Sequence, residues 1–157
     1  MINGKTVVYT AGTFDMLHVN HLKVIEHASL LGDMLIVGVN TDEVVATYKS
    51  KPLIPFEQRL ELVKALKWPD IVIPQRTLEY DKLAKTLHFD VVVVGDDWAG
   101  KFDYLNDLGI EVVYFPRGEG VSSSELKRQI YDEYNKIIEK TDYHIPDSAV
   151  DRSNNES

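Results

Sequence analysis

Short apolar runs alternate along the chain with segments whose apolar residues recur at helical spacing. Four runs rich in β-branched residues predict buried strands, at residues 5–10, 34–40, 90–95 and 110–115. A shorter run predicts a fifth strand at 70–74. Runs of this kind are typical of parallel strands that are covered on both faces.

Helical patterns lie between and after these runs, at residues 21–32, 56–66, 79–88 and 123–140. In the first pattern one face carries Leu22, Ile25, Ala28 and Leu31, and Gly32 is expected to end the helix. Strand and helix alternate throughout. This order predicts an α/β fold, with a Rossmann-like, doubly wound, mostly parallel five-stranded sheet and helices on both faces.

Length and composition limit the domain organisation. With 157 residues, 44% of them hydrophobic, the chain is predicted to form one domain over residues 1–140, followed by a polar, flexible tail over 141–157. The absence of cysteine excludes disulfides, thiolate metal sites and a cysteine nucleophile. Because the N-terminus lacks a signal-peptide pattern and no apolar run is long enough for a bilayer, a cytoplasmic protein is expected.

The net charge of −8 argues against broad nucleic-acid binding, which depends on many Lys and Arg contacts to phosphate. A small anionic ligand remains possible if cations and backbone N–H groups gather locally. In doubly wound sheets such ligands lie beyond the carboxyl ends of the strands. The four chemically distinctive segments all follow predicted strands, and one crevice could collect AGTFDMLHVNH, NTDE, GDDWAGK and PRGEGVSSSE.

His18 and His21 are three residues apart at a helix start, so both imidazoles can point the same way. A polyphosphate there would meet two N–H donors and the positive end of the helix dipole. Two other interpretations stay open, a satisfied pair of structural histidines or a metal site with Asp15 as a further ligand. Asn20 is interpreted as the N-cap of this helix, and Gly12 allows the chain to turn and approach a ligand.

A second anion site is predicted where Arg117 precedes a Gly-rich turn and a run of serines. Ser122 or Ser123 is a good N-cap, and together with Arg117 and backbone N–H groups the hydroxyls can hold terminal phosphates. Lys49 and Lys51 lie in a loop after the second strand and are either solvated or able to fold over the phosphates.

Two further segments have a structural and a functional interpretation. Arg59 can join the loop lysines or pair with a glutamate on its own helix. The run GDDWAGKFD, residues 95–103, is either a capped turn with Trp98 packed on the core or a place where Asp97 and its neighbour orient ribose or polyol hydroxyls.

The motifs GTFDMLHVNH and VSSS resemble those of the cytidylyltransferase group of nucleotidyltransferases, and the resemblance extends over about residues 5–130. Within this group GDDWAGKFD is most similar to the glycerol-3-phosphate cytidylyltransferases. The resemblance implies direct in-line transfer of a cytidylyl group from CTP to glycerol 3-phosphate, with Mg²⁺ on the phosphates, and a homodimer formed through residues 62–74.

The resemblance also implies roles for individual residues. The catalytic residues would be His18, His21, Lys49, Lys51 and Arg117. Nucleotide would be bound by Thr10, Gly12, Thr13, Phe14, Asn20, Gly95, Asp97, Arg117, Ser122, Ser123 and Ser124, and the acceptor substrate by Asp15, Arg59, Lys67, Asp97 and Trp98.

Two positions depart from the family pattern, because Asn20 replaces a glycine and Lys67 replaces an arginine. These departures leave two alternatives. The first is a transferase that uses another phospho-alcohol or another nucleotide, and the second is a nucleotide-binding module without catalysis. A dinucleotide oxidoreductase is disfavoured because GTFDML, and no Gly-x-Gly-x-x-Gly motif, follows the first strand.

Overall fold

The computed structural model describes residues 1–116, 118 and 120–139. The strands are β1 (Val7–Gly12), β2 (Met34–Asn40), β3 (Ile71–Gln75), β4 (Val91–Gly95) and β5 (Glu111–Phe115). The α-helices are α1 (Val19–Ser29), α2 (Asp42–Ala46), α3 (Phe56–Lys64), α4 (Tyr80–Leu87) and α5 (Ser123–Glu139). Two 3₁₀ helices follow β4, η1 (Asp96–Trp98) and η2 (Asp103–Leu108).

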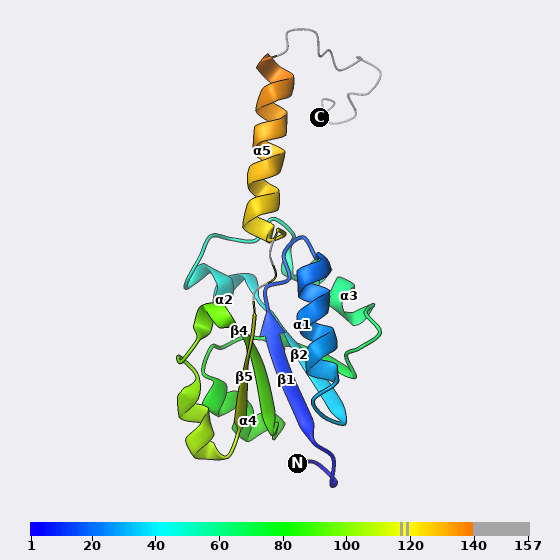
Figure 1. The fold of residues 1–157 in the computed structure, drawn as a ribbon, viewed down its shortest axis with the longest axis vertical. Coiled ribbons are helices and arrows are strands. Elements are labelled where there is room, and N and C mark those ends of the chain that lie inside the picture. The colour runs from blue at the N-terminus through cyan, green and yellow to red at the C-terminus, as the bar shows by residue number, and fades with distance from the viewer. Residues whose placement is uncertain (117, 119, 140–157) are drawn as a thin grey trace, which may run out of the picture. The chain divides into compact units, whose positions relative to one another are not determined.

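The five strands form one sheet in the order β3-β2-β1-β4-β5, and every neighbouring pair is parallel (Figure 1). The chain therefore builds outward from β1 through β2 to β3 and then crosses back to β4 and β5. The reversal of strand order lies between β1 and β4, which is where ligands bind in doubly wound sheets. The predicted fold class is confirmed.

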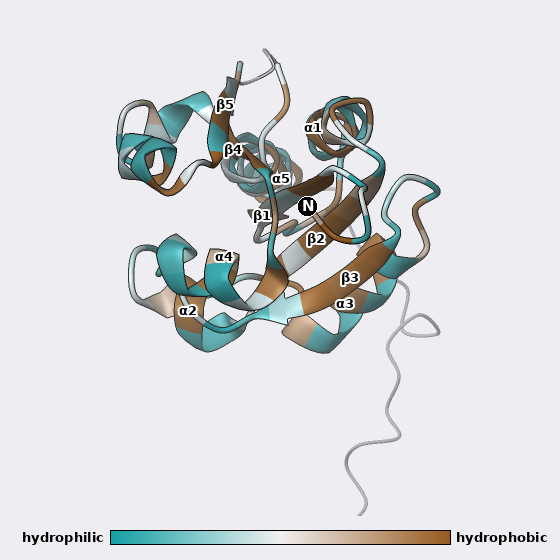
Figure 2. Cartoon of the chain, turned by 90° about the horizontal axis from the view of Figure 1, so that it is seen from below, coloured by the Kyte–Doolittle hydropathy of each residue, from teal (hydrophilic) through white to brown (hydrophobic). Residues whose placement is uncertain are grey.

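The sheet separates two apolar cores. One face buries Tyr9, Val92 and Phe102 against α4 and η2, and the other buries Val8, Ile25 and Val63 against α1 and α3. Figure 2 shows the apolar strands between helices whose outer surfaces are hydrophilic. Burial on both faces explains why the strands are continuous apolar runs in the sequence.

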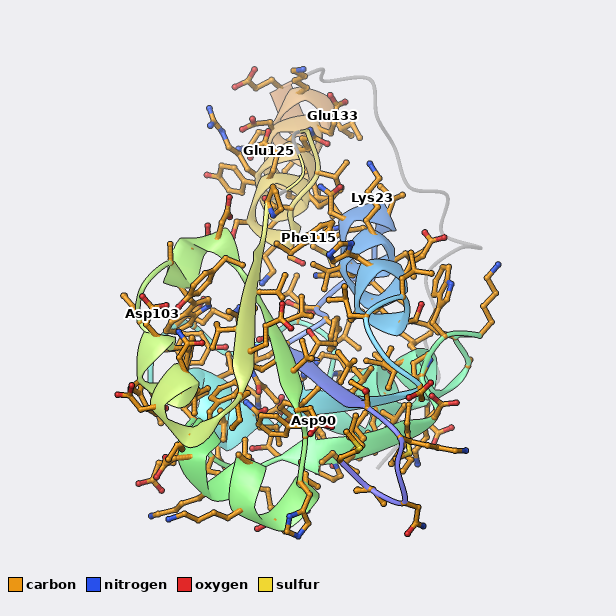
Figure 3. All side chains as sticks on the ribbon, turned by 60° about the horizontal axis from the view of Figure 1, so that its bottom comes forward. Lys23, Asp90, Asp103, Phe115, Glu125 and Glu133 are labelled. Atoms are coloured by element: carbon orange, nitrogen blue, oxygen red, sulfur yellow. The ribbon has the colours of Figure 1, made fainter. Side chains whose placement is uncertain are left out.

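The two edges of the sheet are chemically different. At the amino edge, Asp90 precedes β4, and its carboxylate accepts a 2.8 Å hydrogen bond from the backbone N–H of Val7, the first residue of β1. At the carboxyl edge, Phe115 ends β5 and its ring packs at 5.0 Å from His27 of α1. Figure 3 labels Asp90 and Phe115, which lie at opposite ends of the neighbouring strands β4 and β5.

Helix α1 differs from its prediction at both ends. It begins at Val19 with His18 as N-cap, so the interpretation of Asn20 as N-cap is wrong. It ends at Ser29, capped by Leu30, and Gly32 does not stop it. A Cβ at Gly32 would lie 2.8 Å from the carbonyl oxygen of Thr6 and 2.7 Å from a methyl of Val8, so the glycine permits close packing on β1.

The contacts divide the chain into two compact units, residues 1–123 and residues 124–157. In the second unit the described residues continue α5, which exposes the apolar side chains Ile130, Tyr131, Tyr134 and Ile138. The tail predicted at 141–157 lies outside the described residues. No helix in the described ranges is both long and apolar enough to cross a bilayer.

Candidate active site

The loop after β1 is held in an unusual backbone conformation. Phe14 and Met16 have positive φ angles of 55° and 48°, which non-glycine residues seldom adopt. Between them, the carboxylate of Asp15 accepts 3.0 Å hydrogen bonds from the backbone N–H groups of Leu53 and Ile54. Such strain persists only where the surroundings hold it and is common at functional sites. Asp15, predicted as a substrate contact, therefore fastens the loop before α3 to the loop after β1.

The two histidines form a reciprocal cap at the start of α1. Nδ1 of His18 accepts a 3.3 Å hydrogen bond from the backbone N–H of Asn20, and Nδ1 of His21 accepts a 3.2 Å bond from the backbone N–H of His18. The rings stack with centroids 3.7 Å apart, so they lie together as predicted. Because Nδ1 accepts a backbone N–H in both rings, Nε2 is the ring atom that can donate a hydrogen bond.

His21 lies in an environment that disfavours its charged form. Burial is the largest cause, followed by the charges of His18 and Lys49, and together they lower the pKa of His21 to about 3, although Asp15 acts in the opposite direction. The buried ring of Phe14 meets His21 edge-on at 5.5 Å. His21 is therefore neutral near pH 7. The charge of Lys49 is thus one of the influences on His21.

Asn20 fastens the last loop to the first turn of α1. Its amide nitrogen donates to the carbonyl oxygens of Val121 at 2.6 Å and Gly118 at 3.3 Å. A Cβ at Gly118 would collide with the Asn20 amide, so the loop comes this close only because residue 118 is glycine. The side chain that replaces the family's glycine thus binds this loop.

The serine run begins helix α5. The helix starts at Ser123, so Ser122 occupies the capping position, and the hydroxyl of Ser123 donates to the backbone carbonyl oxygen of Asp15. Ser124 belongs to the second unit. Arg117 lies outside the described residues, and its predicted role in phosphate binding stays a prediction.

Arg59 is fully buried and does not pair with a glutamate of its own helix. Its guanidinium donates to the backbone carbonyl oxygens of Thr13 at 2.6 Å, Asn40 at 2.8 Å and Ile54 at 2.9 Å. It also forms a 2.7 Å ion pair with Asp42 of α2. Arg59 thereby joins the segments that follow β1 and β2 to the loop before α3. This geometry favours a positioning role over the predicted contact with substrate.

The segment after β4 forms helix η1 and places Trp98 partly against the core. Its indole ring meets Tyr48 edge-on, with centroids 5.9 Å apart, and lies 5.7 Å from the ring of Phe102. Asp96 and Asp97 are exposed at the carboxyl end of β4. A Cβ at Gly95 would meet nothing within 4 Å, so the backbone here is open to a ligand.

The side chains of Thr10 and Lys67 make contacts that differ from their predicted roles. The hydroxyl of Thr10, predicted to bind nucleotide, is buried and donates to the carbonyl oxygen of Val93 at 2.8 Å, which ties β1 to β4. Lys67 precedes β3 at the amino edge of the sheet, where its ammonium lies 5.0 Å from the centre of the Trp68 ring. Because His18 lies at the opposite edge, Lys67 cannot contact a substrate held by the histidines of its own chain.

The metal-site interpretation of the histidine pair finds no support among the residues described. Over those residues, no group of three or more histidine, aspartate or glutamate side chains could hold a metal ion. The carboxylate of Asp15, the third ligand in that interpretation, instead accepts two backbone hydrogen bonds.

Three polar residues that organise this edge are not among the predicted site residues: Tyr48, Gln75 and Asn40, the first residue of the segment NTDE. Asn40 and Gln75 are buried and joined by a 2.9 Å hydrogen bond, and Asn40 donates to the Tyr48 hydroxyl at 3.1 Å. The available signal was position, because Asn40 and Gln75 are polar residues that directly end apolar strands. Tyr48 has no such signal.

A parallel, doubly wound sheet with helix-capping histidines at its carboxyl edge defines a Rossmann-like nucleotide-binding protein. The cytidylyltransferase-like family model matches residues 9–129. The chain belongs to this cytidylyltransferase-like family.

Two curated relatives carry the same printed name. The glycerol-3-phosphate cytidylyltransferase of Bacillus subtilis (strain 168) is 44% identical over 124 residues, which cover 78% of this chain and 95% of the relative. The glycerol-3-phosphate cytidylyltransferase of Staphylococcus aureus (strain NCTC 8325 / PS 47) is 36% identical over 125 residues, covering 79% and 94%.

A solved structure shares the fold. The lipopolysaccharide core biosynthesis protein from Thermoplasma volcanium GSS1 superimposes with a TM-score of 0.64 at 27% identity, covering 75% of this chain and all of that one. The two curated relatives and this solved structure therefore each match at least three quarters of the chain.

Proposed function

We propose that this protein transfers the cytidylyl group of CTP to glycerol 3-phosphate, giving CDP-glycerol and pyrophosphate. The observation that carries the proposal is the reciprocal cap of His18 and His21 at the carboxyl edge. The acceptor is inferred from the relatives named for it, which are matched over almost their whole length. The run GDDWAGKFD at the end of β4 supports the same acceptor.

The reaction is a direct displacement at phosphorus. A phosphate oxygen of glycerol 3-phosphate attacks the α-phosphorus of CTP, and the bond to the bridging oxygen of the β-phosphate breaks as pyrophosphate leaves. No protein nucleophile is required. Catalysis then consists of positioning two anions in line and stabilising the charge that develops on the transferred group.

The histidines suit this task because their Nδ1 atoms are occupied by backbone N–H groups. With Nδ1 occupied by a backbone N–H group, each ring presents Nε2–H, with a fixed orientation, to a phosphate oxygen. Lys49 adds positive charge on the same side, since it acts electrostatically on His21. Arg117 and the serines at the start of α5 are proposed to hold the terminal phosphates.

The nucleotide is proposed to lie between the ends of β1 and β4, where the strand order reverses. Backbone around Gly12, Thr13 and Gly95 would line this position, and Asp97 and Trp98 would face the sugar or the acceptor. Arg59 is proposed to act indirectly, by fixing the carbonyl groups of Thr13 and Asn40.

Mg²⁺ is the proposed cofactor. This ion prefers oxygen ligands and is usually held by substrate phosphates with few protein carboxylates. The exposed carboxylates of Asp96 and Asp97 at the end of β4 are oxygen groups of the kind that this ion binds. Bound there, it would supply positive charge against the repulsion between the two phosphate groups.

The decisive experiment measures pyrophosphate release with CTP, ATP, UTP and GTP against glycerol 3-phosphate, choline phosphate, ethanolamine phosphate and a sugar phosphate. We expect turnover with CTP and glycerol 3-phosphate to exceed every other pair. A different preferred pair would refute the substrate assignment. Binding of CTP without pyrophosphate release from any pair would identify a binding module.

We also propose a homodimer formed through residues 62–74. Strand β3 lies at the edge of the sheet. Its first residue, Ile71, exposes 44% of its surface, and Leu62 of α3 exposes 43%. Sedimentation at micromolar concentration is expected to give a dimer that Ile71→Asp converts to a monomer. Leu30→Asp, a change at the exposed leucine that caps the C-terminus of α1, is the control. A monomeric wild-type protein contradicts this proposal.

A further inference from the structure

A chain of hydrogen bonds runs through the sheet from its core to the loop that carries Lys49. The hydroxyl of Tyr9 donates to the Gln75 amide oxygen, and the Gln75 amide nitrogen donates to Asn40 at 2.9 Å. Asn40 then donates to the hydroxyl of Tyr48 at 3.1 Å, which is joined to the hydroxyl of Thr13 at 3.2 Å. These five side chains connect β1, β3 and β2 to the segments that follow β1 and α2.

The inner part of this chain is buried and depends on a close approach. Tyr9 and Gln75 expose none of their surface and Asn40 exposes 5%. A Cβ at Gly38 of β2 would collide with the hydroxyl of Tyr9, so the glycine makes room for the first bond. Buried polar groups that are satisfied in this way hold one arrangement firmly, because leaving one of them unpaired is unfavourable.

Tyr48 is the outer, partly exposed member of this series of hydrogen-bonded side chains. Its backbone and that of Lys49 donate to the carbonyl oxygen of Val45 at 3.1 and 3.0 Å, in the turn that follows α2. Its ring meets Trp98 edge-on at 5.9 Å and lies 5.5 Å below the ammonium of Lys49. The hydroxyl of Tyr48 is thus anchored to the sheet while its ring contacts the segment after β4.

We propose that Tyr48 is a positioning residue, whose hydroxyl anchors the loop after α2 to the sheet and thereby keeps Lys49 beside the histidine pair. This inference rests on the proposed transfer reaction, for which Lys49 supplies charge. Tyr48 acts through Lys49 and Thr13, and it does not itself contact the reacting atoms. The effect of Lys49 on His21 supports the arrangement.

The first test is a double-mutant cycle of Tyr48→Phe and Lys49→Ala. The phenylalanine keeps the ring against Trp98 and removes only the hydroxyl. We expect Tyr48→Phe to lower kcat about tenfold, because small misplacements of catalytic groups are expensive, with KM for CTP changed less than twofold. In the Lys49→Ala background the same change should lower kcat less than twofold.

The matched control is Tyr131→Phe, which removes a hydroxyl from an exposed tyrosine of α5 and is expected to leave kcat and the melting temperature unchanged. A purely structural role predicts a lower melting temperature for Tyr48→Phe with normal turnover of the folded protein. A loss of kcat below threefold, or an equal loss in both backgrounds, overturns the proposal.

A second readout does not depend on turnover. The ring resonances of His21 at neutral pH should shift in Tyr48→Phe and show no further shift when the change is made on Lys49→Ala. If the wild-type enzyme fails to react with CTP and glycerol 3-phosphate, the proposed function fails, and this readout alone decides the role of Tyr48. Unshifted resonances, or the same shift in both backgrounds, then overturn it.

Discussion

Protonation of His21 is expected to make the stability of this protein depend on pH below neutrality. Burial and the charges of His18 and Lys49 lower the pKa of His21 to about 3 in the folded protein, against an ordinary value of 6.5. Between these values the unfolded chain binds a proton at His21 and the folded protein does not. The free energy of unfolding therefore rises with pH over this window and falls as the solution is acidified below pH 6.5.

The magnitude follows from the size of the pKa difference. Each pH unit inside the window changes the free energy of unfolding by about 1.4 kcal/mol. Acidification from neutrality to about pH 4.5 is therefore expected to remove roughly 2–3 kcal/mol through His21. This is a large part of the stability of a small domain.

The assay compares urea unfolding of the wild-type protein and His21→Gln near pH 7 and near pH 4.5. Glutamine does not titrate, and it can still accept the hydrogen bond from the backbone N–H of His18, as in a conventional capping box. Groups that do not interact with His21 titrate alike in both proteins, so their contributions cancel in the difference. We expect the wild-type protein to lose about 2–3 kcal/mol more than the variant on acidification. A difference below about 0.5 kcal/mol would show that His21 keeps an ordinary pKa in the folded protein and would contradict this prediction.

Three further predictions concern the carboxyl edge. Alanine at His18 or His21 should lower kcat about 100-fold and change CTP affinity little, measured by pyrophosphate release and calorimetry, because these donors act on charge that develops in the transition state. Arg59→Met should lower the free energy of unfolding by about 3–5 kcal/mol in urea, since it leaves buried carbonyl groups unpaired, whereas Lys64→Met at an exposed position should change it by less than about 0.5 kcal/mol. Asn20→Ala should raise amide hydrogen exchange at Gly118 and in residues 120–123 about tenfold, and unchanged exchange there would contradict the anchoring of that loop.

The strands were predictable because each is buried on both faces. Parallel strands covered by helices have few positions for polar side chains, so Met34–Asn40 and Val91–Gly95 are almost continuous apolar runs in the sequence. The predicted bounds agree with the structure within two residues. The alternation of strand and helix then leaves few topologies, and the parallel order with its reversal between β1 and β4 follows.

The helices were less predictable where local capping decides their ends. Helix α2 is only five residues long, too short for apolar residues to recur at helical spacing over two turns, so no pattern indicates it. The first helix was placed two residues late because histidine is not a usual N-cap. Only the folded backbone shows that the His18 ring accepts a hydrogen bond from the backbone N–H of Asn20, and the His21 ring one from the backbone N–H of His18.

The sequence by itself determined the fold class, the edge at which the chemistry gathers and the spacing of the two histidines, because these depend on apolar periodicity and on residues close in the chain. Tertiary structure alone decided which charged and polar side chains serve the fold. Arg59 and Lys67 are similar surface cations by pattern, yet one is buried among backbone carbonyl groups and the other lies at the opposite edge of the sheet. The partners of Arg59 are up to 46 residues away along the chain, and they come within hydrogen-bonding distance only when the strands pair.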